Sequence, residues 1–522
     1  MGDGDPPLKD WSTYSCFKAG SNGRGRAHVN FMQAPARHAG VELPPAAAWL
    51  LPVVALLALT FVNPVGYMGG GGDDWHYLQS ARCAVREGLC LPGTHWEARF
   101  PLVLPMSLAM RLLGESAASV QLVPLLYALA GLILFSLNVR RRFGTAAAAI
   151  AGIVLAATPA ISMHALQPMV DGVEFAWCMA ALLAGQLALE RRSQSIAALA
   201  GACLAFAIFS RTTSVVMVPV FGLIWLQLPR DARRLALPFC AGMAAVFAAE
   251  AAAYWIAAGD PFYSWRLMLR HARIPSTELA SWVDTSKSPL LNPDFIAGWR
   301  PSMGIHVHWS IDAVLNLLAD PKCGLTLSGA LGLALVYRDV WRADRLLISL
   351  GGYAALHFVV LIYVLAVDPK PRMFWIEFAS AAVVIAVITT RAWQTGRRLL
   401  PLALLALILA RSLLLSYDRP NPGNMAAAAD AWISRLGPGN IATDEWTRRT
   451  LALVPGVAAL PLQDEAARRY RLVLAERACP PGRVIAAQTW ARDEWAPFAW
   501  ARDHALFIGP RLEPLLCVTD RG

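Results

Sequence analysis

The chain has 522 residues, of which 56% are hydrophobic and 16% are charged, and its formal net charge is +10. A soluble domain usually has about a quarter charged residues, and several runs here reach the roughly 18 to 20 apolar residues that cross a bilayer, which excludes a soluble protein. The arginines lie in short clusters between apolar runs, so membrane topology explains the charge better than a nucleic-acid partner does.

Residues 1–45 are polar and contain no apolar run. A signal peptide needs a short apolar core, so we expect a disordered cytosolic arm instead. Met32 offers an alternative start within this arm.

Hydropathy and helix breakers divide the next part of the chain, residues 46–416, into about eleven transmembrane helices. The apolar stretch 101–113 is too short to span and is expected to lie along the membrane or dip into it. The expected spans are residues 46–63, 117–138, 144–162, 170–189, 195–209, 213–228, 235–258, 323–337, 346–366, 373–390 and 399–416.

Basic clusters orient this bundle. They follow the second, fourth, sixth, eighth and tenth spans, so all of them fall on one side, which the positive-inside rule makes the cytoplasm. The opposite face then has the loop 64–116, the long loop 259–322 and the tail 417–522. The tail is polar enough to fold as a small extracytoplasmic α/β domain. The Ala-rich and Arg-rich composition suggests a bacterium, and therefore its inner membrane.

The first outer loop opens with four glycines followed by Asp73 and Asp74. Two carboxylates at the outer end of a span indicate acid–base chemistry at the membrane surface. The alternative is that they only cap the helix that follows, although a capping turn would also hold a carboxylate in place.

The same loop closes with Glu97 and Arg99. A guanidinium suits a phosphate ligand, and the alternative is that Arg99 only reaches toward the membrane surface.

Further polar residues lie at the outer ends of later spans. Asp171 and Glu174 open the fourth span. The alternative is that Asp171 only caps this helix, but acidic groups at the edge of a bundle cost energy and rarely lack a function. Arg211 and Arg372 break the cytoplasmic bias of the other arginines, which predicts a local anionic partner: a lipid headgroup, a carboxylate or a substrate phosphate. Glu250, His357 and Glu377 lie within spans, where structural hydrogen bonds are the favoured explanation.

Metal and cofactor signals are weak. His306 and His308 lie two residues apart, but nothing nearby completes a metal site. Disulfides are open at Cys83 with Cys90 and at Cys479 with Cys517, because sequence alone does not give pairing. No nucleotide-binding loop is found, so we expect no cofactor, and a sugar substrate would have to arrive on a lipid. No nucleic-acid partner is expected. Dependence on a divalent metal is left open, although the sequence gives no support for it.

The order of the motifs resembles the GT-C glycosyltransferases, in particular the dolichyl-phosphate-mannose–protein mannosyltransferase-like family, to which the lipid A aminoarabinose transferase is related. The resemblance covers roughly residues 46–416. Its motifs are Asp73-Asp74-x-x-Tyr77, Trp96-Glu97-x-Arg99-x-Pro101, Pro168-x-x-Asp171-Gly172, Ser210-Arg211-Thr212, Gly259-Asp260-Pro261-Phe262-Tyr263 and Arg372-Met373-Phe374.

The resemblance implies a GT-C-like helical bundle and an inverting transfer of a monosaccharide from a polyprenyl-phosphate donor. It implies Asp73 as the catalytic base, with Asp74 and Asp171 as further acidic site residues. The expected substrate-binding residues are Tyr77, Glu97, Arg99, Glu174, Arg211 and Arg372. Membrane lipids surround the protein, and the acceptor is a lipid, a glycan or a protein. A lipid-linked-glycan transporter or flippase and a non-catalytic membrane scaffold are the alternatives.

Overall fold

The computed structural model describes most of the chain beyond residue 42. The described ranges are 43–68, 72–88, 90–227, 230–271, 309–342, 344–364, 371–417, 422–462, 468–475, 478–489 and 515–520. The chain divides into a unit of Met1–His38 and a unit of Ala39–Gly522, and the described helices and strands all belong to the second unit. The expected disordered arm and the pair His306 and His308 lie outside the described residues.

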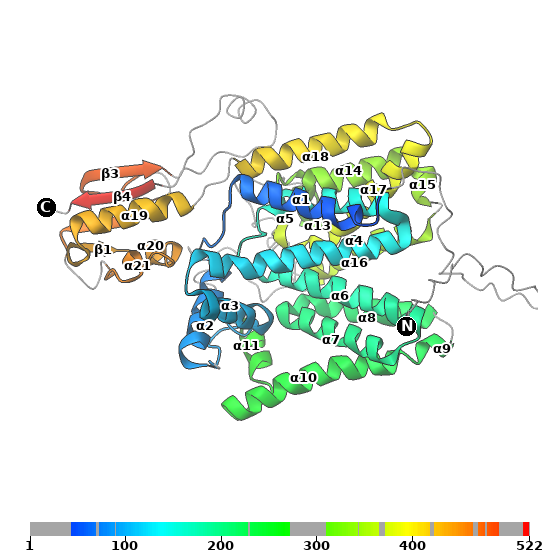
Figure 1. Cartoon of the computed structure of the whole chain (residues 1–522), viewed down its shortest axis with the longest axis horizontal. Coiled ribbons are helices and arrows are strands. Elements are labelled where there is room, and N and C mark those ends of the chain that lie inside the picture. Colours follow the sequence, from blue (N-terminus) through cyan, green and yellow to red (C-terminus); the bar gives the residue numbers. More distant parts are fainter. Residues whose placement is uncertain are drawn as a thin grey trace, which may run out of the picture. The chain divides into compact units, whose positions relative to one another are not determined.

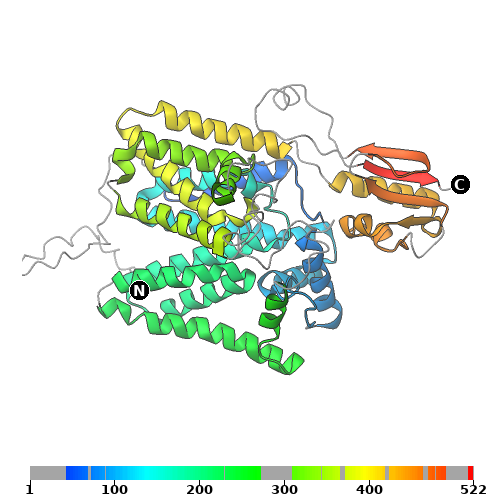
Figure 2. The same cartoon turned by 180° about the vertical axis from the view of Figure 1, so that it is seen from behind.

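Apolar helices that run side by side form the body of this unit (Figures 1 and 2). They are α1 (Ala47–Val62), α4 (Ala117–Ala156), α6 (Val170–Arg191), α7 (Gln194–Ser210), α8 (Met217–Gln227), α10 (Ala236–Ala258), α14 (Gly324–Val336), α16 (Arg345–Val359), which continues as the π-helical turn η2 (Val360–Val364), α17 (Trp375–Gln394) and α18 (Leu399–Tyr417). Within the described residues, five helices are long and apolar enough to cross a membrane, and six apolar helices are shorter. The protein is therefore a multi-pass membrane protein; a total of about eleven spans stays a prediction.

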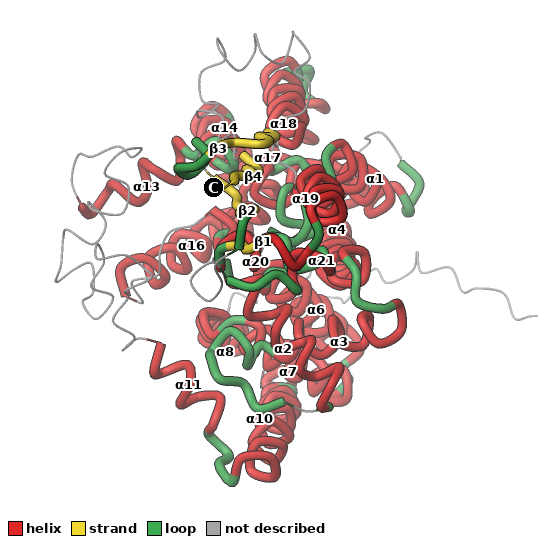
Figure 3. The backbone as a smooth tube through the Cα atoms, turned by 90° about the vertical axis from the view of Figure 1, so that its left-hand side faces the viewer, coloured by secondary structure: helices red, strands yellow, loops and turns green. Residues whose placement is uncertain are grey.

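Short helices join these long ones. On the basic side are α9 (Arg230–Arg233) and α15 (Arg338–Arg342). The other connections contain α2 (Asp73–Glu87), α3 (Phe100–Leu113), α5 (Pro159–Ser162), η1 (Thr212–Val216), α11 (Tyr263–His271), α13 (Trp309–Ala319) and η3 (Pro371–Met373). Figure 1 shows α2, α3 and α11 at the same end of the bundle, and Figure 3 looks onto that end.

The α4 segment contains a reversal at Gly144, which has the non-helical angles φ 86° and ψ 174°. A Cβ at Gly152 would lie 2.8 Å from Oγ of Ser136. In one straight helix, residues this far apart in sequence would be separated by about 24 Å. The two halves of α4 therefore pack side by side after the chain reverses. The sequence predicts this arrangement, because it places two spans on either side of the basic turn Arg140–Gly144.

Helices α7 and α10 approach each other closely because each has a glycine that faces the backbone of the other helix. A Cβ at Gly201 would lie 1.9 Å from the carbonyl oxygen of Phe239, and one at Gly242 would lie 1.9 Å from that of Ala198. Small residues allow backbones to pack directly in membrane helices, where lipid and helix are equally apolar.

Substituting Gly201→Ala is expected to destabilise the folded state by about 1–3 kcal/mol, because the added methyl forces the two backbones apart. Thermal unfolding in detergent measures this. Gly222→Ala on α8 is the matched control, because a Cβ there meets nothing within 4 Å. Equal stability of the two variants would contradict the close packing of α7 on α10.

After α18 the tail contains a four-stranded sheet and short helices; that it is a separate extracytoplasmic α/β domain stays a prediction. Its sheet has the order β1-β2-β4-β3, with β1 (Ile441–Thr443) parallel to β2 (Tyr470–Ala475) and β4 (Leu515–Asp520) antiparallel to both β2 and β3 (Arg483–Thr489). The helices are α19 (Pro422–Leu436), the 3-10 turn η4 (Pro438–Asn440), α20 (Glu445–Thr450) and α21 (Pro455–Ala458). Apolar side chains of α19 and α21 pack on the buried face of the sheet.

Two hydrogen bonds join the C-terminal end of α20 to the loop 64–116. Helix C-termini leave carbonyl oxygens without partners. Here the hydroxyl of Tyr67 donates to the carbonyl oxygen of Arg449 at 2.8 Å, and Arg82 on α2 donates to that of Ala452 at 2.8 Å. Ala452 is buried in the same apolar cluster as Tyr77 and Leu78 of α2. The tail therefore supports the helix that begins with Asp73.

Candidate active site

The site begins at the first turn of α2, where two adjacent carboxylates have different surroundings. Carboxylates are favoured at a helix N-terminus, because the unpaired backbone N–H groups there carry partial positive charge. Asp74 is buried, and its side chain accepts hydrogen bonds from the backbone N–H groups of Met68 at 2.9 Å and Trp75 at 3.1 Å. Asp73 keeps 29% of its side chain exposed. Asp74 thus holds the turn, and Asp73 remains accessible.

Arg372 joins Asp73 to the helical bundle. It lies in η3, just before α17, and its Nη2 donates to Oδ2 of Asp73 at 2.9 Å. Its Nε lies 3.8 Å from Oδ2 of Asp171, the second residue of α6. Burial alone would lower the pKa of Arg372, but Asp171 and Asp73 raise it above the ordinary value. The guanidinium therefore stays charged between two carboxylates.

A second arginine continues the chain of charges inward. Arg211 ends α7, and its Nη1 donates to Oδ1 of Asp171 at 2.8 Å and lies 3.8 Å from Oε2 of Glu174. Glu174 also accepts hydrogen bonds from the hydroxyls of Ser214 at 2.5 Å and Thr213 at 3.3 Å. All three charged side chains are at least nine-tenths buried. Buried charges persist only when paired, and these are paired.

Arg99 and Tyr77 stand beside this chain of charges. Arg99 is buried, burial lowers the pKa of its guanidinium, and the groups acting on its charge include Tyr77, Arg211 and Glu174. Its Nη1 donates to the thioether sulfur of Met268 at 3.6 Å. Tyr77 is 1% exposed, and burial raises the pKa of its phenol well above the ordinary value, so it stays neutral.

Glu97 takes part in a separate hydrogen-bond network. It accepts a hydrogen bond from the backbone N–H of Gly93 at 2.7 Å and lies 3.7 Å from Nδ1 of His76. Burial would raise the pKa of Glu97, but the hydrogen bonds with His76, Gly93 and Thr94 lower it. No contact joins Glu97 to Asp73 among the described residues.

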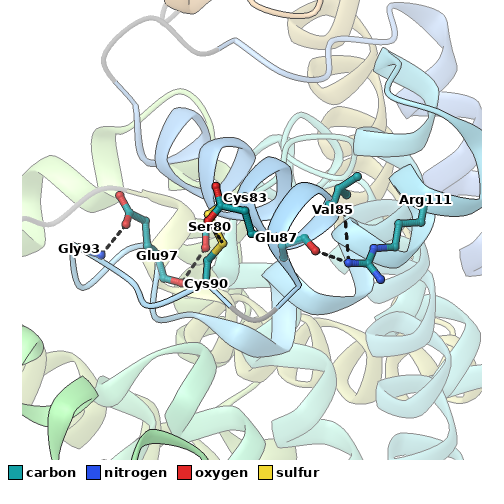
Figure 4. The surroundings of a disulfide bond; sticks show 9 residues. Ser80, Cys83, Val85, Glu87, Cys90, Gly93, Glu97 and Arg111 are labelled. Atoms are coloured by element: carbon teal, nitrogen blue, oxygen red, sulfur yellow. Dashed lines mark hydrogen bonds between the residues drawn. A yellow bond between two sulfur atoms is a disulfide. The ribbon is translucent and has the colours of Figure 1, made fainter. Parts of the chain in front are cut away.

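A disulfide joins Cys83 on α2 to Cys90 in the segment that follows this helix (Figure 4). The tail has the second disulfide, between Cys479 and Cys517. The structure therefore forms both pairings that the sequence leaves open. Both lie in segments that the sequence assigns to the outer face, where an oxidising compartment preserves disulfides.

An apolar groove of about 690 Å³ lies between α3, α7 and α10. Small and apolar residues of α7 and α10 form most of its wall, and Glu97, Phe100, Glu250 and Tyr254 also line it. Phe100 borders the groove, whereas the preceding residue, Arg99, is under the influence of the buried charges. Two adjacent residues thus face different surroundings, the apolar groove and the charged site.

The polar residues predicted within spans form pairs. Glu250 accepts a hydrogen bond from the hydroxyl of Ser264 at 2.5 Å, and Nδ1 of His357 lies 2.7 Å from Oε1 of Glu377. These pairs are consistent with structural hydrogen bonds, the explanation that the sequence favours for Glu250, His357 and Glu377. Sequence reasoning missed Thr213 and Ser214, although they directly follow the Arg211 motif, and also Met169 and Met268, whose sulfurs contact arginines.

Metal chemistry has little support among the described residues. Their one cluster of three possible ligands is Cys83, Glu87 and Cys90. Its two cysteines are joined to each other, so their sulfurs are not thiolate ligands. That the protein needs no cofactor stays a prediction.

Comparisons with known proteins agree on the fold. Residues 102–255 match the family model for dolichyl-phosphate-mannose-protein mannosyltransferase. No curated protein sequence matches the chain.

Among solved structures, the oligosaccharyltransferase AglB from Archaeoglobus fulgidus, in complex with an inhibitory peptide and a dolichol-phosphate, has a TM-score of 0.51 at 13% identity, covering 82% of this chain and 69% of that one. The A. fulgidus oligosaccharyltransferase tethered to an acceptor peptide has a TM-score of 0.53 at 12% identity, covering 83% and 69%. ArnT from Cupriavidus metallidurans bound to undecaprenyl phosphate has a TM-score of 0.48 at 12% identity, covering 90% and 97%. Residues 102–255 thus resemble the dolichyl-phosphate-mannose-protein mannosyltransferase family, and the fold of the chain is similar to that of the A. fulgidus oligosaccharyltransferase.

Proposed function

We propose that the protein is a membrane glycosyltransferase that moves a monosaccharide from a polyprenyl-phosphate donor to an acceptor hydroxyl on the extracytoplasmic face. The observation that carries the proposal is the partly exposed carboxylate of Asp73, held 2.9 Å from a buried arginine at the outer end of the bundle. A base beside a cation suits a reaction in which a hydroxyl attacks and a phosphate leaves.

The groove supports a donor that is a lipid. Its wall is mostly apolar, helices α7 and α10 contribute to it, and its lining includes Phe100, the residue that follows Arg99. A prenyl chain would occupy the groove and bring its phosphate to the arginines. The dolichol-phosphate in the similarly folded AglB structure is a ligand of this chemical class.

In the proposed reaction, the acceptor hydroxyl oxygen attacks the anomeric carbon of the donor sugar while Asp73 accepts its proton. The bond from that carbon to the phosphate oxygen breaks, and polyprenyl phosphate leaves as an anion. Arg99 and Arg372 stabilise the growing charge. A single displacement inverts the anomeric carbon. Asp74 holds the turn, and Asp171, Glu174 and Arg211 position Arg372.

The orientation follows from the same features. Both disulfides, Asp73 and the tail would face the periplasm of a bacterium, with the arginine clusters in the cytoplasm. The acceptor is a hydroxyl of a lipid, a glycan or a protein.

A transfer assay tests this function. The purified protein is incubated with polyprenyl phosphate carrying a radiolabelled sugar, together with envelope extract as the source of acceptor. We expect label to leave the lipid fraction and to appear in lipid, glycan or protein. Label that crosses the bilayer of a proteoliposome but stays on its lipid would instead identify a flippase and contradict the proposal.

A further inference from the structure

The donors of Arg372 are poorly matched with acceptors. A guanidinium has five N–H donors in a planar fork. In Arg372, Nη2 donates to Asp73 at 2.9 Å, Nη1 donates to the sulfur of Met169 at 3.2 Å, and the buried Nε has no hydrogen-bond partner among the described residues. A thioether is a weak acceptor, so this buried arginine has one strong hydrogen-bond partner in the described part of the chain, Asp73.

Arg99 also donates to a thioether, which is a weak acceptor. Its Nη1 donates to the sulfur of Met268 at 3.6 Å, and its side chain is buried. Arg211 differs, because it forms ion pairs with two buried carboxylates, those of Asp171 and Glu174. Arg99 and Arg372 therefore retain donor capacity for an oxyanion, and bidentate binding of phosphate by arginine is the strongest use of it.

The two carboxylates at Arg372 also differ in how firmly they are held. Asp171 is 7% exposed and is fixed by Arg211 at 2.8 Å, whereas Asp73 is 29% exposed. Asp73 is the carboxylate that a ligand can displace, because water or the acceptor can take up the hydrogen bonds that it loses.

We propose that Asp73 is the resident anion of a phosphate site, and that the donor phosphate displaces it from Arg372. This inference rests on the proposed function. In the free protein, Arg372 holds the carboxylate of Asp73. When the phosphate binds Nη1 and Nη2 of Arg372 together with Arg99, Asp73 is released to accept a hydrogen bond from the acceptor hydroxyl. The donor then binds first, and the base is available only in its presence.

A double-mutant cycle tests the displacement, with a fluorescent, sugar-free polyprenyl phosphate as the probe. Asp73→Asn removes the competing anion, so we expect probe affinity to rise about threefold or more. In the Arg372→Gln background the same substitution is expected to give no gain. Asp73→Glu, which keeps the competing charge, is the matched control and should also give no gain. Thermal midpoints of all variants establish that each is folded.

The outcomes separate the alternatives. An equal gain in both backgrounds would show simple charge repulsion and overturn the displacement, and so would unchanged or weaker binding by Asp73→Asn. Inorganic phosphate at the same concentration is expected not to compete with the probe, because the groove binds the prenyl chain. Failure of the unmodified protein to bind the probe would contradict the proposed function itself.

Discussion

Replacing Asp73 with Asn is expected to reduce sugar transfer by about 10²–10⁴-fold, the usual contribution of a general base. Asparagine has nearly the same shape, but it cannot accept the hydroxyl proton. The assay is release of radiolabelled sugar from polyprenyl phosphate, measured at saturating donor so that altered donor binding does not hide the effect.

Two other carboxylates control for this result. Asp339→Asn alters an exposed residue of α15 and should leave transfer unchanged. Asp74→Asn replaces an oxygen that accepts a backbone hydrogen bond, so it should lower the thermal midpoint as well as activity. Full activity in a folded Asp73→Asn protein would remove this residue from the mechanism.

Replacing Arg211 with Leu is expected to destabilise the protein by about 3–5 kcal/mol, the usual cost of removing one partner from a buried ion pair. Glu174 would lose its cation, and Asp171 would keep only the more distant Arg372 at 3.8 Å. Thermal unfolding in detergent and the yield of folded protein measure the effect.

The explanation can be checked by rescue. Adding Glu174→Gln and Asp171→Asn to Arg211→Leu neutralises the uncompensated carboxylates, so the triple variant should regain much of the lost stability. It should remain a poor transferase, because Asp171 also faces Arg372. Arg211→Leu with unchanged thermal stability would show that these groups are not buried as charges.

The sequence predicts the bundle better than it predicts the site. Apolar runs and arginine clusters reflect the bilayer directly, so each predicted span overlaps one of the helices, and the turn before Gly144 is a true reversal. The β-strands of the tail are short, and their pairing joins distant segments such as Tyr470 and Asp520. Hydropathy carries no information about such pairing.

For the site, the sequence indicates which residues are unusual but not which of them meet. Arg211 and Arg372 are conspicuous because they lie away from the arginine clusters that the sequence assigns to the cytoplasm, and the structure shows their partners, Asp171 and Asp73. Glu97 belongs to a motif that the sequence also singles out, yet it accepts its hydrogen bond from Gly93 in its own loop. Helix packing decides these pairings, and one sequence does not specify it.

The separation of these pairs along the chain has a consequence for biosynthesis. Asp171 and Arg211 are 40 residues apart, but Asp73 and Arg372 are 299 apart. A ribosome releases the acidic groups well before the arginines that neutralise them. Asp73 therefore has no Arg372 partner until the segment before α17 is made. Formation of this ion pair and closure of the bundle by α17 then become one late event in biosynthesis, so a product terminated before Arg372 would lack the pair.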